Sequence, residues 1–298
     1  MKSIRERLAA GEVLVADGAM GTALMKEDLG AGTPLEAIHL ERAEIVERIT
    51  REFVLAGADL VQTNTFGAHP ANLARYGLEN RCEEIVGSAI RVARRAAGDR
   101  AAVFLSVGPS TRILRPYGDA APEEIAAGFR RVIAAAMREG VDLVVVETMT
   151  DPLEAAMAVK AAAEEDDSVP VAATMTFDET PRGFYTIMGT SIEQAIRQLE
   201  DGGAEIVGSN CGNGTAKMVE IAREFRDLTD LPLIIQSNAG LPEIREGAAL
   251  YMETPDLFGA RTLDFLGAGV SILGGCCGTT PAHTAAIRAA VDAFRKAT

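Results

Sequence analysis

The stretch Val141–Pro152, VDLVVVETMTDP, carries the pattern that decides the fold of this 298-residue chain. A nearly continuous apolar run, Val141–Glu147, is followed at once by polar residues and a proline. Apolar runs without alternation are typical of strands that are buried on both faces of a parallel sheet. The stretch therefore predicts an interior strand of a parallel sheet that ends in a polar loop.

The same pattern recurs from one end of the chain to the other. Between the apolar runs, segments such as 122–140 and 215–229 place apolar residues every three or four positions, which predicts amphipathic helices. Eight strands, each followed by a helix, favour a (β/α)8 TIM barrel of the α/β class, and an open doubly wound sheet is the alternative. The predicted strands are Val13–Ala16, Ala58–Thr63, Ala101–Val107, Val141–Glu147, Val169–Thr176, Ala204–Ser209, Leu231–Gln236 and Val270–Gly274.

Composition narrows the class of protein further. Without a linker, a low-complexity tract or an abrupt change in charge, we expect one domain over residues 1–298. A net charge of −14 argues against nucleic acid and against anionic membranes as partners. The apolar runs are too short to span a bilayer, and the charged N-terminus does not resemble a signal peptide. We therefore expect a cytoplasmic protein, whose thiols stay reduced.

Three of the four cysteines follow predicted strands: Cys211 after the sixth, and Cys276 and Cys277 after the eighth. Strand ends meet at one rim of a closed barrel, so these three thiols are expected to converge. Three thiolates suit Zn²⁺ and leave its fourth tetrahedral position open, as catalytic zinc sites require. The adjacent pair could instead be two unrelated core residues or a vicinal disulfide. Cys82 is expected to be a small buried hydrophobe.

Other polar residues are less specific. Asp17 and Glu147 end two predicted strands on the same rim, where they could cap helices, form salt bridges or bind the ammonium of an amino acid. We expect surface or capping roles for the three histidines, His39, His69 and His283. The glycines of DGAMGT (residues 17–22) lack the spacing of a nucleotide-binding motif.

Taken together, DGAMGT, QTNTF, VGPSTR, ETM, SNCG, SNAG and GGCCGTTPAH resemble the homocysteine S-methyltransferase family over most of the chain. Within that family the sequence is most similar to the homocysteine-binding module of cobalamin-dependent methionine synthases. The resemblance implies that Cys211, Cys276 and Cys277 bind zinc and that Asn238 fills the fourth position until substrate arrives. It also implies that Asp17 and Glu147 hold the substrate amino group, while backbone amides at Gly18 and Ala19 receive its carboxylate.

The implied reaction is methyl transfer to the thiol of L-homocysteine, which gives methionine. Full-length methionine synthases continue into folate, cobalamin and activation domains, whereas this sequence stops after the first module. We therefore expect the donor to be a methylcorrinoid, such as methylcobalamin, on a separate protein. Betaine is disfavoured, because its aromatic cage includes a tryptophan and this chain has none.

Four alternatives remain open at this point. The donor could be S-methylmethionine or another sulfonium, and the acceptor could be a related thiol. The chain could be a homocysteine-binding subunit that is inactive without its partner chain. It could also be a barrel enzyme that uses a cysteine nucleophile and no metal.

Overall fold

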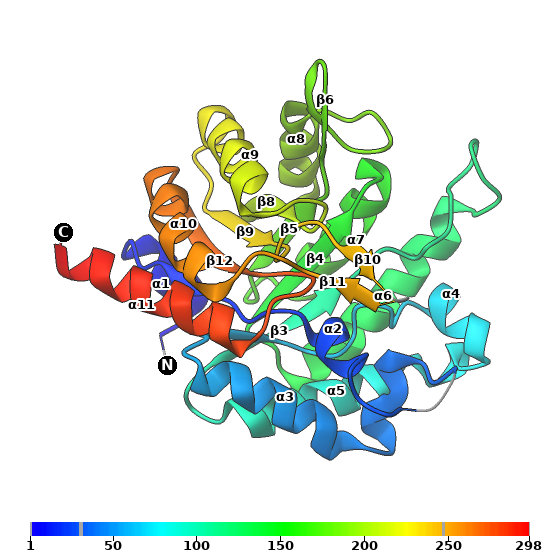
Figure 1. The fold of residues 1–298 in the computed structure, drawn as a ribbon. Coiled ribbons are helices and arrows are strands. Elements are labelled where there is room, and N and C mark those ends of the chain that lie inside the picture. Colours follow the sequence, from blue (N-terminus) through cyan, green and yellow to red (C-terminus); the bar gives the residue numbers. More distant parts are fainter. Residues whose placement is uncertain (1, 30–31, 246–247, 298) are drawn as a thin grey trace.

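Eight parallel strands form the centre of this computed structural model, which describes residues 2–29, 32–245 and 248–297, and helices surround them (Figure 1). The strand order is β1-β12-β9-β8-β5-β4-β3-β2. All eight predicted strands are confirmed, and none of their ends differs by more than two residues. Their bounds are β1 Leu14–Val15, β2 Leu60–Gln62, β3 Ala102–Val107, β4 Leu143–Met149, β5 Val171–Met175, β8 Ile206–Asn210, β9 Leu233–Ser237 and β12 Val270–Gly275.

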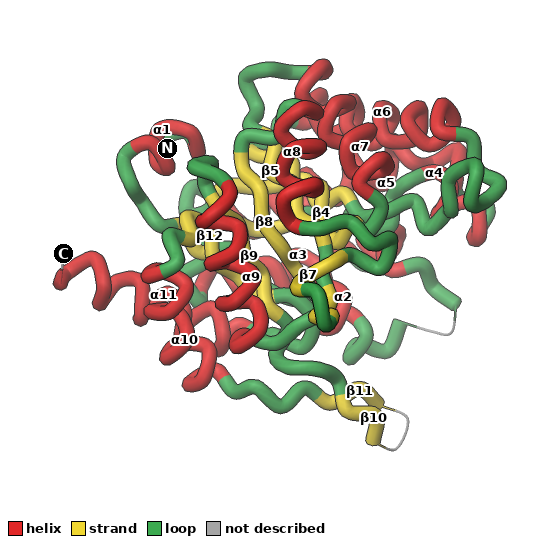
Figure 2. Tube along the Cα trace, turned by 90° about the horizontal axis from the view of Figure 1, so that it is seen from above, coloured by secondary structure: helices red, strands yellow, loops and turns green. Residues whose placement is uncertain are grey.

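The sheet closes between its first and last strands. Ala16 forms a parallel bridge with Leu60, and the Asp17 N–H donates to the Leu60 carbonyl at 2.9 Å. On the other side of this bridge, the Asp59 N–H donates to the Val15 carbonyl at 2.7 Å. Seen from above, the strands lie in the middle and the helices outside (Figure 2). These contacts confirm the barrel and exclude the open sheet.

The barrel interior changes from apolar to polar toward the carboxyl ends of the strands. Alternate residues of a strand point to the same side. Along β4, Leu143 and Val145 belong to the interior apolar cluster, and Glu147 is the next residue of that series. The same step leads from Ile206 on β8 to Asn210, with Gly208 between them. An apolar floor therefore lies beneath a polar layer.

The surrounding helices confirm the periodicity seen in the sequence, because α6 and α9 cover the two segments predicted as amphipathic helices. Two antiparallel hairpins were not predicted: β6 (Asp178–Thr180) with β7 (Gly183–Tyr185), and β10 (Glu243–Arg245) with β11 (Ala248–Leu250). The helices are α1 Ile4–Ala9, α2 Met20–Leu24, η1 Leu35–Leu40, α3 Ala43–Leu55, α4 Pro70–Leu73, η2 Ala74–Tyr76, η3 Glu79–Arg81, α5 Cys82–Ala97, α6 Pro122–Glu139, α7 Pro152–Glu165, α8 Ile192–Gly202, α9 Thr215–Leu228, α10 Pro255–Gly267 and α11 Pro281–Ala297.

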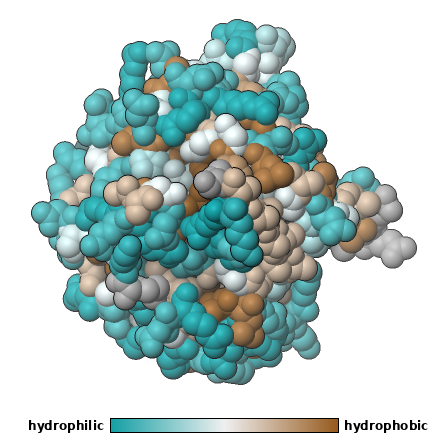
Figure 3. Space-filling view, turned by 90° about the vertical axis from the view of Figure 1, so that its left-hand side faces the viewer, coloured by the Kyte–Doolittle hydropathy of each residue, from teal (hydrophilic) through white to brown (hydrophobic). Residues whose placement is uncertain are grey.

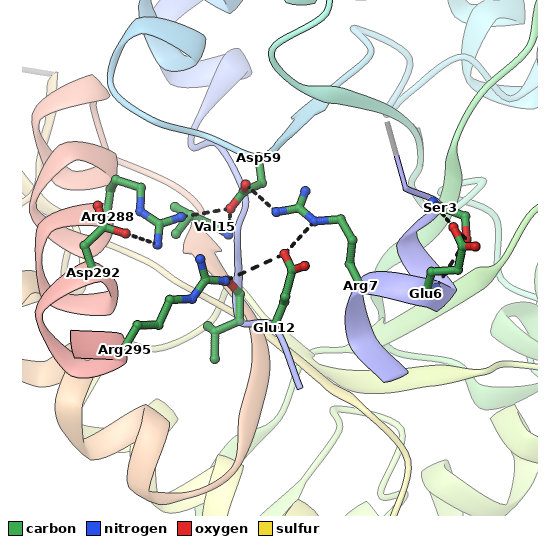
Figure 4. A network of polar contacts seen from close by, with 10 residues as sticks. Ser3, Glu6, Arg7, Glu12, Val15, Asp59, Arg288, Asp292 and Arg295 are labelled. Carbon is green, nitrogen blue, oxygen red and sulfur yellow. Dashed lines mark hydrogen bonds and ion pairs between the residues drawn. The ribbon is translucent and has the colours of Figure 1, made fainter. Parts of the chain in front are cut away.

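A network of charged side chains ties α1 and α11 to the start of β2 (Figure 4). Asp59 accepts hydrogen bonds from Arg7 Nη2 at 2.7 Å, from Arg288 Nη1 at 3.0 Å and from the Val15 N–H at 2.9 Å. Glu12 accepts a second bond from Arg7 at 2.9 Å and lies 3.9 Å from Arg295. Helices from both ends of the sequence are thereby joined at the amino-terminal side of the barrel.

The outer surface beside these helices is mostly hydrophilic, with small and separate apolar patches (Figure 3). Helix α11 explains this pattern, because it buries Ile287 and Val291 and exposes charged residues on its other side. Among the helices in the described ranges, none has the length and apolar character needed to cross a bilayer.

Candidate metal and substrate site

Three cysteine side chains meet at the carboxyl end of the barrel. Cys211 follows β8, while Cys276 and Cys277 follow β12. The sulfur of Cys277 lies 3.8 Å from that of Cys211 and 4.0 Å from that of Cys276. All three sulfurs lie within 4.8 Å of one another. A distance of 4.0 Å between Cys276 and Cys277 also excludes the vicinal disulfide considered above.

The backbone around the cysteines explains how neighbouring strands hold them. The Cys211 N–H donates to the Gln236 carbonyl at 3.1 Å, and the Cys276 N–H donates to the Ser237 carbonyl at 2.7 Å. Both cysteines are thus anchored to β9, the strand between their own. Gly278 ends the turn with φ +80°, and a Cβ at this position would lie 2.1 Å from the Tyr251 ring. Only glycine fits there.

The chemistry of the cluster is that of a cation site. Hydrogen bonds from Cys276 and Cys277 lower the pKa of Cys211 to about 3. The pKa of Cys277 rises to about 11, chiefly through its bond to Cys211, and that of Cys276 also rises. Three close thiols cannot all ionise unless a cation compensates their charge. The donor set therefore fits zinc, whose sites use thiolates in tetrahedral geometry.

Asn238 lies beside the cluster, as the resemblance implied. Its Oδ1 accepts a hydrogen bond from the Cys277 N–H at 3.1 Å, and its side chain is also hydrogen-bonded to Cys211. The amide oxygen is therefore held near the sulfurs by the backbone. Its assignment as a fourth ligand stays a prediction.

Asp17 is fully buried at the end of β1, and it forms no ion pair with any described residue. Its oxygens accept hydrogen bonds from the Gln62 N–H at 2.8 Å and from Gln62 Nε2 at 3.1 Å. Burial raises the pKa of Asp17 to about 8, and the charge of Glu147 also raises it. Asp17 is buried, has no cationic partner among the described residues and is repelled by the charge of Glu147. A positively charged ligand would stabilise its ionised form, so the position suits such a ligand.

Glu147 is 8% exposed and lies on β4. It accepts hydrogen bonds from Ser106 Oγ at 2.5 Å and from Asn210 Nδ2 at 3.2 Å. Burial raises its pKa to about 7, and the charge of Cys211 raises it as well. Asp17 and Cys211 are therefore both near enough to Glu147 to interact with it electrostatically.

The loop after β1 approaches the loop after β12 closely. A Cβ on Gly18 would lie 2.5 Å from Thr279 Oγ1 and 2.9 Å from the Phe53 ring, so a larger residue does not fit without movement. The Ala19 N–H donates to Thr279 Oγ1 at 3.2 Å. Of the two amides expected to receive a carboxylate, that of Ala19 thus already has a hydroxyl partner.

The remaining cysteine and the histidines serve the structure. Cys82 is fully buried, as expected, and its thiol donates to the Ala68 carbonyl. His69 caps α4 by accepting from the Ala71 N–H, which confirms the capping role. The expected surface or capping role is wrong for His39, which is 2% exposed and bonds to the Ile85 carbonyl. His283 is also buried, and it accepts from the Thr280 N–H at the start of α11.

Sequence reasoning missed three residues that orient the carboxyls: Gln62, Ser106 and Asn210. Each of them lies in the polar layer above the interior apolar cluster. The alternation of side chains along a strand identifies them, because each lies two or four residues beyond an apolar residue that points into the barrel. Of the uncharged polar residues in that layer, Asn238 was named in advance and these three were not.

A parallel barrel with a three-cysteine cluster and two buried carboxyls at its rim defines a class of proteins that act on small molecules at the strand ends. The family model for homocysteine S-methyltransferase matches residues 14–291. The chain therefore belongs to the homocysteine S-methyltransferase family.

Two relatives agree with this assignment, and a solved structure agrees with the fold. The methionine synthase of Mycobacterium tuberculosis is 33% identical over 95% of this chain, and that of Mycobacterium leprae is 32% identical over 95%. The chain spans only 25% and 24% of these proteins. The metallated form of the homocysteine methyltransferase MmuM from Escherichia coli has the same fold, with a TM-score of 0.80, 24% identity, and coverage of 96% of this chain and 99% of that one.

Proposed function

We propose that this chain is a zinc-dependent methyltransferase that methylates the thiol of L-homocysteine to give methionine. The observation that carries the proposal is the cluster of three sulfurs within 4.8 Å of one another, beside two buried carboxyls that form no ion pair with a described residue. Homocysteine presents the complementary groups, a thiol at one end and an ammonium at the other. We place the reaction in the cytoplasm, where the cysteines stay reduced.

Cys211, Cys276 and Cys277 would hold the zinc, and Asn238 is proposed as the ligand that gives way to substrate. A free thiol with a pKa of about 8.5 is only about 3% ionised at pH 7. Zinc held by these cysteines would supply the positive charge that keeps an incoming thiol deprotonated. The reactive fraction then rises about thirtyfold, which corresponds to roughly 2 kcal/mol.

The carboxyls position the other end of the substrate. We propose that Asp17 and Glu147 accept hydrogen bonds from the homocysteine ammonium, and that backbone amides at Gly18 and Ala19 receive its carboxylate. The Ala19 amide would exchange its present bond to Thr279 Oγ1 for the substrate. Gln62 donates a hydrogen bond to Asp17 and Ser106 donates one to Glu147, which holds the two carboxyls in place. Holding both ends of the molecule converts a bimolecular encounter into an oriented one, which supplies much of the remaining rate enhancement.

The proposed methyl donor is a methylcorrinoid carried by a separate protein. Support comes from the methionine synthases, which extend far beyond the quarter of their length that this chain matches. A sulfonium such as S-methylmethionine is the second candidate. Support for this candidate comes from the Escherichia coli homocysteine methyltransferase. The match covers 99% of that protein, so its length resembles that of a single barrel and not that of a methionine synthase.

A donor panel tests the proposal. The zinc-loaded chain is incubated with homocysteine and with methylcobalamin, a methylcorrinoid protein or S-methylmethionine, and methionine is measured. We expect methionine with the corrinoid donors, and its loss when a strong chelator removes zinc. Turnover that survives the chelator would favour the alternative of a cysteine nucleophile without metal. Homocysteine binding without turnover on any donor would indicate a homocysteine-binding subunit that needs a partner chain.

A further inference from the structure

Asn210 connects the two halves of the candidate site. It is the last residue of β8, fully buried, and it directly precedes Cys211. Its Nδ2 donates to Glu147 Oε2 at 3.2 Å and to Cys276 Sγ at 3.8 Å. One amide group therefore contacts both a carboxyl and a sulfur that come from different strands.

The orientation of this amide is set by two threonines. Asn210 Oδ1 accepts from Thr174 Oγ1 and from the Thr148 N–H, both at 2.7 Å, and Nδ2 donates to Thr148 Oγ1 at 2.7 Å. These bonds distinguish the oxygen from the nitrogen, because the backbone N–H can only donate. The nitrogen therefore faces Glu147 and Cys276.

The hydrogens of Nδ2 are fewer than its acceptors. The group carries two hydrogens and faces three acceptors: Thr148 Oγ1, Glu147 Oε2 and Cys276 Sγ. The short bond to Thr148 uses one hydrogen, so Glu147 and Cys276 share the other. The positions of the carboxyl and the sulfur are thus linked through a single N–H.

The backbone on both sides of this contact is unusual. Thr148, which follows Glu147, has φ 60°, and Cys211, which follows Asn210, has φ 61°. Residues other than glycine are strained in this region, so surrounding contacts must hold them there. The bond from the Thr148 N–H to Asn210 Oδ1 is such a contact.

We propose that Asn210 is a positioning residue that sets the spacing between the carboxyl for the substrate ammonium and the cysteine site for its thiol. This inference rests on the proposed function. A thiol that also carries an ammonium then gains affinity from both contacts at once, whereas a thiol without the ammonium gains from one. Without Asn210 the two contacts still exist, but they are no longer held at the distance that homocysteine spans.

The test measures binding rather than turnover. Dissociation constants of homocysteine and of 4-mercaptobutanoate, which lacks the amino group, are determined by calorimetry on zinc-loaded protein. We expect Asn210→Ala to reduce the preference for homocysteine about tenfold while zinc content stays at the wild-type level. An unchanged preference would overturn the inference, whether the affinity for both thiols is kept or is lost equally.

A second pair of variants decides the matter if Asn210→Ala does not fold. Thr174→Val removes the hydroxyl that orients the amide, and Thr174→Ser keeps it. We expect Thr174→Val to lower the preference and Thr174→Ser to retain it; equal preferences in the two variants would contradict the proposal. If wild-type protein does not bind homocysteine in a zinc-dependent way, the proposed function itself fails, which is a distinct outcome.

Discussion

At the scale of single residues, the site depends on groups that are costly to bury alone. Asp17 and Glu147 are buried with raised pKa values, and neither has a positive partner among the described residues. A protein retains such groups where a ligand supplies the missing charge. The same reasoning applies to the three thiols, which need a cation to ionise together.

Changing Cys276 to alanine should abolish zinc retention, because two sulfurs remain of the three that lie within 4.8 Å. Metal content is measured after dialysis. The matched control is Cys82→Ala, which removes a buried cysteine outside the cluster and should keep zinc. Wild-type metal content in Cys276→Ala would refute its role as a ligand.

Changing Asp17 to asparagine should alter how stability depends on pH. The folded pKa of Asp17, about 8, lies above its ordinary value of 3.8, so its stabilising effect is complete below about pH 4 and is lost as pH rises toward 8. The unfolding free energy of wild type should therefore fall by a few kcal/mol relative to Asp17→Asn between pH 4 and 8. Denaturant titrations without homocysteine measure this difference; parallel curves would contradict the raised pKa.

At the scale of secondary structure, the eight strands were predictable because burial on both faces leaves long apolar runs, as in Val141–Glu147. The hairpins were not, since their strands have only three residues each and β6 is also polar. The three cysteines were predictable from their places after strands. The contacts of Asn210 were not, because they depend on left-handed backbone at Thr148 and Cys211, two residue types that seldom adopt it.

Changing Gly278 to alanine should disturb the turn that carries Cys276 and Cys277. The residue has φ +80°, and an added Cβ meets the Tyr251 ring at 2.1 Å. We expect a loss of about 1–2 kcal/mol in unfolding free energy and at least tenfold weaker zinc binding. The control is Gly267→Ala in α10, where an added Cβ would point into open space and stability should rise by up to about 1 kcal/mol. Tight zinc binding by Gly278→Ala would show that the turn tolerates a side chain.

At the scale of the whole molecule, opposite ends of the barrel have separate tasks. The carboxyl ends gather the sulfurs and carboxyls, whereas the amino ends join α1, β2 and α11 through Asp59. Charges at the amino end should therefore affect stability without affecting the site.

Changing Asp59 to alanine tests this division. The change leaves Arg7 and Arg288 without their shared acceptor, and their side chains are only 15% and 17% exposed. Because Arg7 keeps Glu12 and Arg288 keeps Asp292, we expect about 1–2 kcal/mol lower unfolding free energy with unchanged zinc affinity. Asp119→Ala, which breaks the exposed pair with Arg112, should change neither quantity. Loss of zinc affinity in folded Asp59→Ala would show that the two ends are coupled.

The central claim is that Cys211, Cys276 and Cys277 hold one zinc ion that accepts the substrate thiol. X-ray absorption at the zinc edge measures this directly, with and without homocysteine. The account predicts three sulfur neighbours and one lighter atom in the substrate-free protein, and four sulfurs once homocysteine is added. Fewer than three sulfurs at the start, or a sulfur number that homocysteine leaves unchanged, would contradict it.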